Sequence, residues 1–165
     1  MARAGNLCGE KIFLPAESTG NGREGEEMMT FEEIKELRNH TNPFANGLGM
    51  VITEIQEGYA RVEVPIQGSM ENAAHSVHGG LMYTLCDAAC GAAAASYQYK
   101  VTTVDSSFHY LRPAIECKML YAIAKEVKHG KRIMVYDVEL FDEKDTLLCK
   151  GIFSMMQLKF PLTAE

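Results

Sequence analysis

The chain of 165 residues has the length of one ordinary domain, long enough to bury a sizeable core. Its composition, 47% hydrophobic and 23% charged, excludes a disordered, collagen-like or coiled-coil protein. The net charge of −6 argues against a nucleic-acid partner, and the absence of an apolar run of ~18 residues argues against a membrane-spanning helix.

The first segment, residues 1–28, is rich in glycine and glutamate and has no apolar periodicity. It has neither the basic start and apolar stretch of a secretory signal nor the low acidity of a mitochondrial presequence. We therefore expect a flexible extension, followed by a single domain over 29–160 and a short tail over 161–165. The domain should open with a helix capped by Thr30, because Glu33 completes a capping box. The apolar stripe of this helix is formed by Phe31, Ile34 and Leu37.

From Leu48 onward, the sequence is mainly typical of β-strands. Apolar residues at 60, 62 and 64 alternate with polar ones, which is the period-two pattern of a half-buried strand. The expected strands are 51–55, 60–64, 100–112, 117–128, 132–142 and 146–158. Short polar or glycine-containing turns separate them, at 57–58, 129–131 and 142–145. Because these connections are short, antiparallel pairing is favoured over parallel crossovers.

Residues 79–97 break this pattern. They combine strong helix formers with small residues, so we expect a helix that is apolar on every side and therefore buried. Gly91, which costs about 1 kcal/mol against alanine inside a helix, is expected to permit close approach of another backbone. A buried helix wrapped by an antiparallel sheet, with two strands before it and three or four after it, is an α+β architecture.

The only charge inside this helix is Asp87. A carboxylate in an apolar setting costs several kcal/mol unless it is paired or solvated, which makes Asp87 a candidate functional group. The helix is preceded by His78, and Gly79 and Gly80 leave its first N–H groups open to an anion or a developing oxyanion. Asn72 could orient a water or a carbonyl. Together these features suggest acyl-group chemistry.

The spacing of these residues carries a family resemblance. Asn72, His78-Gly79-Gly80 and Asp87, followed by an Ala/Gly-rich helix, resemble the motif of the hotdog-fold acyl-CoA thioesterases of the phenylacetate (PaaI-like) type. Residues 102–114 and 150–153 are similar to strand segments of the same family, and the resemblance covers about residues 42–158. It implies a hotdog fold, in which an antiparallel β-sheet wraps around a long central α-helix.

The resemblance also implies a role for each candidate residue. Asp87 corresponds to the catalytic carboxylate, which acts either as nucleophile or as general base toward water. Gly79 corresponds to the backbone N–H that polarises the thioester carbonyl, and Asn72 and His78 correspond to residues that hold the carbonyl or water and the loop. Thr103 stands where relatives commonly have a serine or threonine beside the carboxylate.

Two positions depart from the family pattern. His75 stands where relatives often have glycine or another small residue. Ser106 and Ser107 stand in place of a more usual hydrophobic–polar pair. These departures leave the expected chemistry intact and bear on the choice of acyl group.

The expected activity is hydrolysis of an aryl- or fatty-acyl-CoA, with coenzyme A as part of the substrate and no separate cofactor. Gly79 and Asp87 are eight positions apart, about 12 Å along a helix, so one helix cannot easily present both to one thioester. Two antiparallel helices in a twofold dimer can, as the resembled family implies, so we expect a homodimer or a dimer of dimers with shared sites. Lys131 and Arg132 form either a solvated hairpin tip or a contact for the CoA phosphates.

Two other functions stay open at this point. A hotdog enoyl-thioester hydratase or dehydratase would also use a histidine and an acid, although residues 76–80 lack the prolines usual in those enzymes. A non-catalytic acyl-CoA-binding regulatory module would have no need to retain both Asn72 and Asp87.

The five cysteines are an odd number without metal-ligand spacing. This pattern predicts reduced thiols in a cytoplasmic compartment, with neither a disulfide framework nor a metal site. Cys86 and Cys90 could form a reactive pair on the central helix, but inert packing is the more common role of such residues. His109 fits an ordinary strand position better than a catalytic base.

Overall fold

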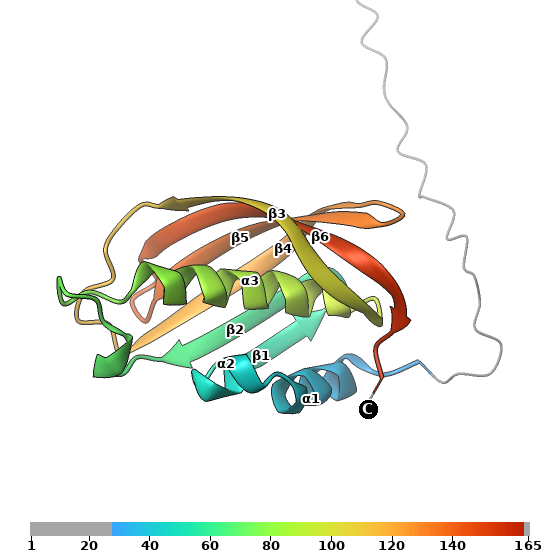
Figure 1. The fold of residues 1–165 in the computed structure, drawn as a ribbon, viewed down its shortest axis with the longest axis horizontal. Helices are drawn as coiled ribbons and strands as arrows, with labels where there is room; N and C mark the ends of the chain where they lie inside the picture. The colour runs from blue at the N-terminus through green and yellow to red at the C-terminus, as the bar shows by residue number, and fades with distance from the viewer. Residues whose placement is uncertain (1–27, 164–165) are drawn as a thin grey trace, which may run out of the picture.

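A six-stranded antiparallel β-sheet wraps around one long helix, α3 (Gly79–Ala95), in the computed structural model (Figure 1). The structure describes residues 28–163, so the extension predicted over 1–28 lies outside the described residues apart from Met28. Along the sheet the strands follow the order β1-β2-β4-β5-β6-β3. The strands are β1 (Val51–Gln56), β2 (Tyr59–Pro65), β3 (Tyr99–Tyr110), β4 (Met119–His129), β5 (Ile133–Asp142) and β6 (Leu147–Pro161). The predicted α+β architecture and all six predicted strands are confirmed.

The described chain begins and ends at the same place, beside Gln98 just after α3. The backbone N–H and C=O of Met29 form hydrogen bonds of 3.0 Å each with the side-chain amide of Gln98. The backbone N–H of Leu162 donates to the Gln98 carbonyl at 2.9 Å. Leu162, which the sequence assigned to the tail over 161–165, therefore bonds to the domain.

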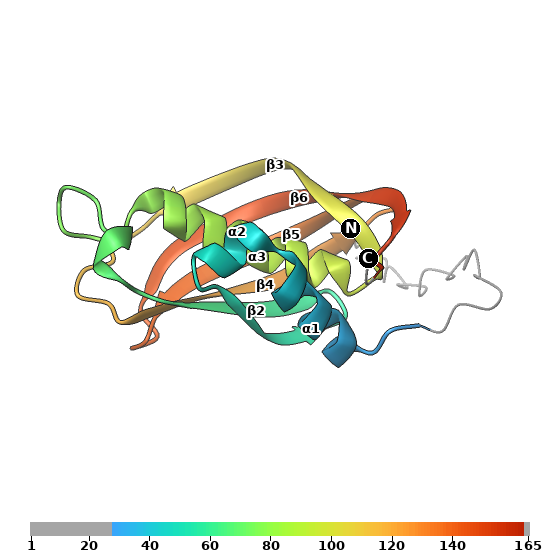
Figure 2. The ribbon, with the colours of Figure 1, turned by 60° about the horizontal axis from the view of Figure 1, so that its bottom comes forward.

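Two short helices lie alongside α3 on the side of the sheet that holds it (Figure 2). The first, α1 (Phe31–Thr41), has the predicted capping box, in which the Thr30 hydroxyl and the Glu33 carboxylate bond each other's backbone N–H groups. The second, α2 (Pro43–Gly47), was not expected from the sequence, because five residues are too few to show a helical period. A short 3₁₀ turn, η1 (Gly68–Met70), leads toward the loop before α3. Within residues 28–163, none of the helices is long and apolar enough to cross a membrane.

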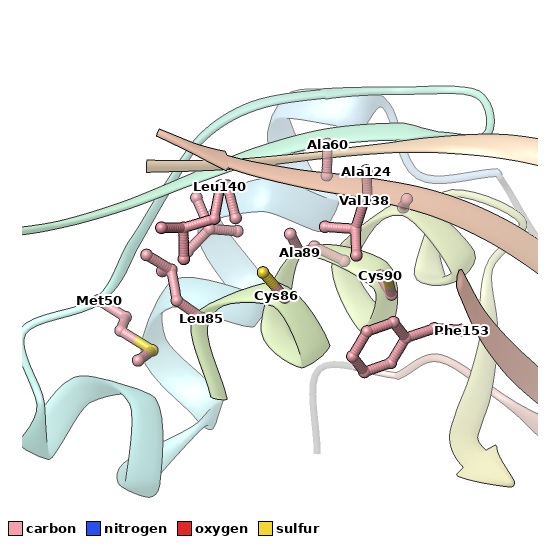
Figure 3. Close-up of a cluster of buried hydrophobic side chains, with 14 of the residues drawn as sticks. Met50, Ala60, Leu85, Cys86, Ala89, Cys90, Ala124, Val138, Leu140 and Phe153 are labelled. Carbon is pink, nitrogen blue, oxygen red and sulfur yellow. The ribbon is translucent and has the colours of Figure 1, made fainter. Parts of the chain in front are cut away.

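The core lies between α3 and the concave face of the sheet (Figure 3). Small side chains on the helix, Cys86, Ala89 and Cys90 among them, are fully buried. They face strand residues that include Ala60, Ala124, Val138, Leu140 and Phe153. Because so many of these side chains are small, the sheet can curve closely around the helix. Such a core is close-packed, and it holds the two ends of α3 in fixed positions.

The expectation that α3 is apolar and buried on every side is wrong for one stripe. Tyr83, Thr84, Asp87 and Ala88 are only half-buried, whereas the residues on the other faces are buried. Positions spaced by three and four residues share one side of a helix. Asp87 thus lies on the one side of α3 that the sheet does not cover.

Candidate functional site

Asp87 is held by a strand residue that the sequence had already singled out. The Thr103 hydroxyl of β3 donates a hydrogen bond of 2.6 Å to Asp87 Oδ1. The same hydroxyl oxygen lies 3.5 Å from the sulfur of Met155 on β6. Charge-assisted hydrogen bonds of this length fix the orientation of a carboxylate. The other oxygen, Oδ2, has no hydrogen bond within the described part of the chain and is available to a ligand.

A cavity of about 320 Å³ opens beside this carboxylate. It lies between α3, the first half of β3 and the helices α1 and α2. Its polar wall includes Asp87, Thr103 and Tyr83, and its apolar wall includes Met155 and Ala88. A partly apolar cavity with a few converging polar groups has the usual features of a small-molecule site.

Arg38 on α1 also lines this cavity and was not among the site residues expected from the sequence. The Nε of Arg38 is buried without a hydrogen-bond partner. Burial lowers the pKa of Arg38, and the negative charge of Asp87 acts in the opposite direction. A signal was present, because Arg38 stands four residues after the buried Ile34 and so lies on the apolar stripe of the helix.

Arg38 also corrects the prediction for Gly91. A Cβ atom added at Gly91 would lie 3.4 Å from Arg38 Nη2 and 3.9 Å from Met155 Cε. Two side chains therefore approach this glycine, and the expected approach of another backbone is wrong. The glycine leaves room for the guanidinium one helical turn beyond Asp87.

The N-terminus of α3 lies at a different cavity, of about 300 Å³, whose walls include Asn72, Gly79 and Tyr110. His78 is the N-cap of the helix, and its Nδ1 accepts the N–H of Gly80 at 2.9 Å. The Tyr110 hydroxyl donates to the carbonyl of Gly79 at 2.9 Å. The Gly79 N–H forms no hydrogen bond within residues 28–163, so it is free to receive an oxyanion.

Asn72 organises the loop that leads to this helix. Its Oδ1 accepts the backbone N–H of Ala74 at 2.8 Å and that of Ser76 at 3.4 Å. Its Nδ2 donates to the Ser76 hydroxyl at 2.9 Å. In the described chain, the amide is therefore engaged with its own loop, and its position beside Gly79 follows from that loop.

The structure thus separates the predicted site residues into two groups. Asp87 and Thr103 line the first cavity, Asn72 and Gly79 line the second, and the two cavities share no residue. His78 lines neither of these two cavities but caps the helix between them.

Lys131 and Arg132 also lie apart from both cavities, at the hairpin between β4 and β5. An Arg132 Nη2 lies 3.7 Å from the Met156 sulfur. Their expected contact with CoA phosphates is not tested by this arrangement and stays a prediction.

The remaining candidate residues, the two cysteines of the central helix and His109, occupy positions that do not indicate a catalytic role. Cys86 and Cys90 are fully buried, and burial raises the pKa of both thiols well above the ordinary value, which disfavours the reactive thiolate. His109 lies on an exposed part of β3, 3.5 Å from the Ser107 hydroxyl. Among residues 28–163, no group of three or more His, Cys, Asp or Glu side chains is arranged to hold a metal ion.

Comparison with known proteins gives consistent results. The family model of the thioesterase superfamily matches residues 74–149. The acyl-coenzyme A thioesterase PaaI of Escherichia coli is 31% identical over 100 residues, which are 61% of this chain and 71% of that protein. A structure of the E. coli PaaI protein superposes with a TM-score of 0.77 at 24% identity, over 81% of this chain and 96% of that one. A Streptococcus pneumoniae thioesterase structure with coenzyme A gives 0.64 at 26% identity, over 68% and 88% of the two chains.

Proposed function

Since this chain belongs to the PaaI-like hotdog thioesterases and is a thioester hydrolase, we propose that its substrate is an aryl- or fatty-acyl-CoA and that Asp87 drives the hydrolysis. The observation that carries the proposal is the Asp87 carboxylate, which Thr103 orients through one oxygen and which lines a cavity of about 320 Å³. The crystallised S. pneumoniae relative with coenzyme A supports a CoA ester as the substrate.

The proposed chemistry needs one basic or nucleophilic oxygen and one oxyanion donor. As a general base, Asp87 takes a proton from water while the water oxygen attacks the thioester carbon. As a nucleophile, Asp87 attacks the carbon itself and forms an anhydride that water then cleaves. In both routes, the Gly79 N–H stabilises the negative charge that develops on the carbonyl oxygen, and the C–S bond breaks to release the CoA thiolate.

One chain does not bring these two groups together. Gly79 and Asp87 are separated by two helical turns, about 12 Å of rise, and line different cavities. We therefore propose that two copies of the chain form the site, with Asp87 of one protomer opposite Gly79 of the other. A homodimer is the smallest such assembly, and a dimer of dimers retains the same sites.

The sheet supports this arrangement at one specific place. Within the described chain, β3 pairs only with β6, so its other edge is free to pair with a second copy of itself. The Tyr83 hydroxyl lies 2.6 Å from the Ser106 hydroxyl, which joins the second turn of α3 to the second half of β3. Tyr83 stands midway between Gly79 and Asp87. A twofold axis beside this pair would place Asp87 of one copy opposite Gly79 of the other.

The experiment that tests the proposal is a measurement of CoA release from aryl-, short-, medium- and long-chain acyl-CoA substrates. We expect multiple turnovers with at least one substrate class, and a loss of at least ~10²-fold in kcat for Asp87→Asn with the fold retained. Hydration of an enoyl-CoA without thiol release would assign the protein to the hydratases. Tight binding without turnover would assign it to the binding modules.

Two further parts of the proposal have separate tests. A single turnover in ¹⁸O-labelled water tests the nucleophilic route, since label in the Asp87 carboxylate requires the anhydride. If Lys131 and Arg132 contact the CoA phosphates, replacing both with glutamine should raise KM for acyl-CoA and leave kcat unchanged.

A further inference from the structure

Arg38 is a half-buried cation for which the described chain provides no direct partner. Its guanidinium forms no hydrogen bond and no ion pair within residues 28–163, and its Nε is fully buried. A guanidinium has five N–H donors and remains ionised, so burying the Nε–H without an acceptor is unfavourable. An arrangement of this kind is expected where a ligand supplies the acceptor.

The position of Arg38 relative to Asp87 defines where that acceptor would lie. Arg38 Nη2 is 3.4 Å from the place of a Cβ at Gly91, and Gly91 follows Asp87 by one turn, about 6 Å of rise along α3. Arg38 and Asp87 line the same cavity, yet no nitrogen of one is within 4.0 Å of an oxygen of the other. A molecule that touches both must therefore extend across this space.

The lining of the cavity between them is also unsuited to a purely hydrocarbon chain. Besides the two charges it contains the hydroxyls of Thr84 and Thr102 and the amide nitrogen of Asn42, none of which forms a hydrogen bond within residues 28–163. Leaving such groups without partners disfavours an apolar ligand. An acyl group that carries its own oxygen atoms at the far end would satisfy them.

We propose that Arg38 is a specificity-determining residue that binds the distal oxygen atoms of the acyl group, and that the cavity takes short acyl groups ending in a carboxylate. This inference rests on the proposed thioesterase function and names its substrate class. A five-carbon dicarboxylic acyl group has its two ends about 5 Å apart, which matches one helical turn. Its thioester carbon would lie beside Asp87 while its carboxylate receives the planar fork of Arg38 in two parallel hydrogen bonds.

The test compares two substrates of the same shape, glutaryl-CoA and 5-methylhexanoyl-CoA, in which two methyl groups replace the carboxylate oxygens. We expect the wild-type kcat/KM to favour glutaryl-CoA by at least about tenfold, the range of a hydrogen bond to a charged group. Arg38→Met, which keeps volume and removes the donors, should lower kcat/KM for glutaryl-CoA by about 10- to 100-fold and leave that for 5-methylhexanoyl-CoA unchanged or higher. Lys35→Met is the matched control, since it removes a charge from the same helix at a residue paired only with Glu32, and it should keep the wild-type ratio.

The possible outcomes separate this inference from the proposed function. CoA release from other thioesters, without a preference for glutaryl-CoA over its apolar analogue, would overturn the inference and leave the function standing. An equal loss on both substrates in Arg38→Met would also overturn it, as would a loss of dimer in that variant, which would mean that a second protomer supplies the acceptor. If Arg38→Met does not fold, the test uses the ratio of kcat/KM for glutaryl-CoA to that for 5-methylhexanoyl-CoA, measured in the wild type and in Arg38→Lys. A wild-type ratio below about tenfold, or an equal loss on both substrates in Arg38→Lys, would overturn the inference. Absence of CoA release from every thioester would overturn both proposals.

Discussion

The phenol of Tyr110 lies directly against Gly79, the residue that begins the central helix. Its hydroxyl donates to the Gly79 carbonyl at 2.9 Å, and its ring atoms lie 3.2 and 3.3 Å from the place of a Cβ at that position. A side chain at position 79 would push against this ring and shift the start of the helix, including the open Gly79 N–H.

The first prediction follows from this contact. Gly79→Ala should lower kcat/KM for acyl-CoA by about 10²-fold, the scale for loss of one oxyanion donor. Gly68→Ala is the matched control, because nothing lies within 4 Å of a Cβ there, and it should remain close to wild type. Normal activity in a folded Gly79→Ala enzyme would show that the close contact with Tyr110 does not set the position of this N–H.

The hydrogen bond between Thr103 and Asp87 gives a second prediction. Thr103→Val keeps the shape of the side chain and removes the hydroxyl, so the carboxylate loses its fixed orientation. We expect kcat to fall roughly tenfold, less than for Asp87→Asn, because the base itself remains. Thr103→Ser retains the hydroxyl and should restore most of the activity. Equal kcat values for the valine and serine variants would show that the hydroxyl does not position Asp87.

The loop held by Asn72 contains a strained residue, which gives a third prediction. His75 has a φ of 56°, in the left-handed region, and its side chain is exposed. This conformation costs an L-residue roughly 1–2 kcal/mol, while the freer unfolded chain of glycine costs about 0.5–1 kcal/mol. His75→Gly should therefore raise the free energy of unfolding by up to about 1 kcal/mol, measured by denaturant titration.

The neighbouring position provides the control for that measurement. Ala74 does not have a positive φ, so Ala74→Gly should lower the free energy of unfolding by about 0.5–1 kcal/mol. If both substitutions destabilise the protein equally, the left-handed conformation at position 75 carries no strain.

The buried thiols give a fourth prediction. Cys86, Cys90 and Cys149 are buried, and burial raises the pKa of Cys149 to about 11. At pH 8 these thiols stay protonated, because a pKa above the solution pH leaves little thiolate. In a Cys8→Ser/Cys117→Ser variant, a thiol-reactive disulfide reagent should label no site in the native state and three sites after unfolding. Rapid native labelling of Cys86 or Cys90 would restore the reactive-thiol interpretation of this helix.

Much of the fold was predictable because its signals are local. The period-two alternation from 60 to 64, the capping box at Thr30 and Glu33, and the run of small residues over 79–97 each specify one element. Asp87 was identified as the only charge inside the apolar helix and Thr103 through the family resemblance, and the structure brings them into contact. Their contact could not be derived from spacing, since it depends on how β3 returns across α3.

The errors arose where tertiary packing decides. α3 was taken as apolar on every side, although Tyr83 and Asp87 lie on a stripe that the sheet leaves open. Gly91 was assigned to a backbone contact, but the group that fills the space is Arg38, from a helix fifty residues earlier in the chain. A single charge on an apolar stripe was the only sequence signal for that residue, and it has no meaning until the partner surface is known.

If each active site combines Asp87 of one protomer with Gly79 of another, two inactive chains should complement each other when they are mixed. Asp87→Asn and Gly79→Val chains are unfolded together in equal amounts, refolded and assayed for CoA release. Random pairing makes about half of the dimers mixed, and each mixed dimer has one site with both groups intact and one with neither. We predict recovery of about one quarter of the wild-type activity. If mixed dimers are present and activity does not rise above that of the separate variants, the site lies within one chain and the account is wrong.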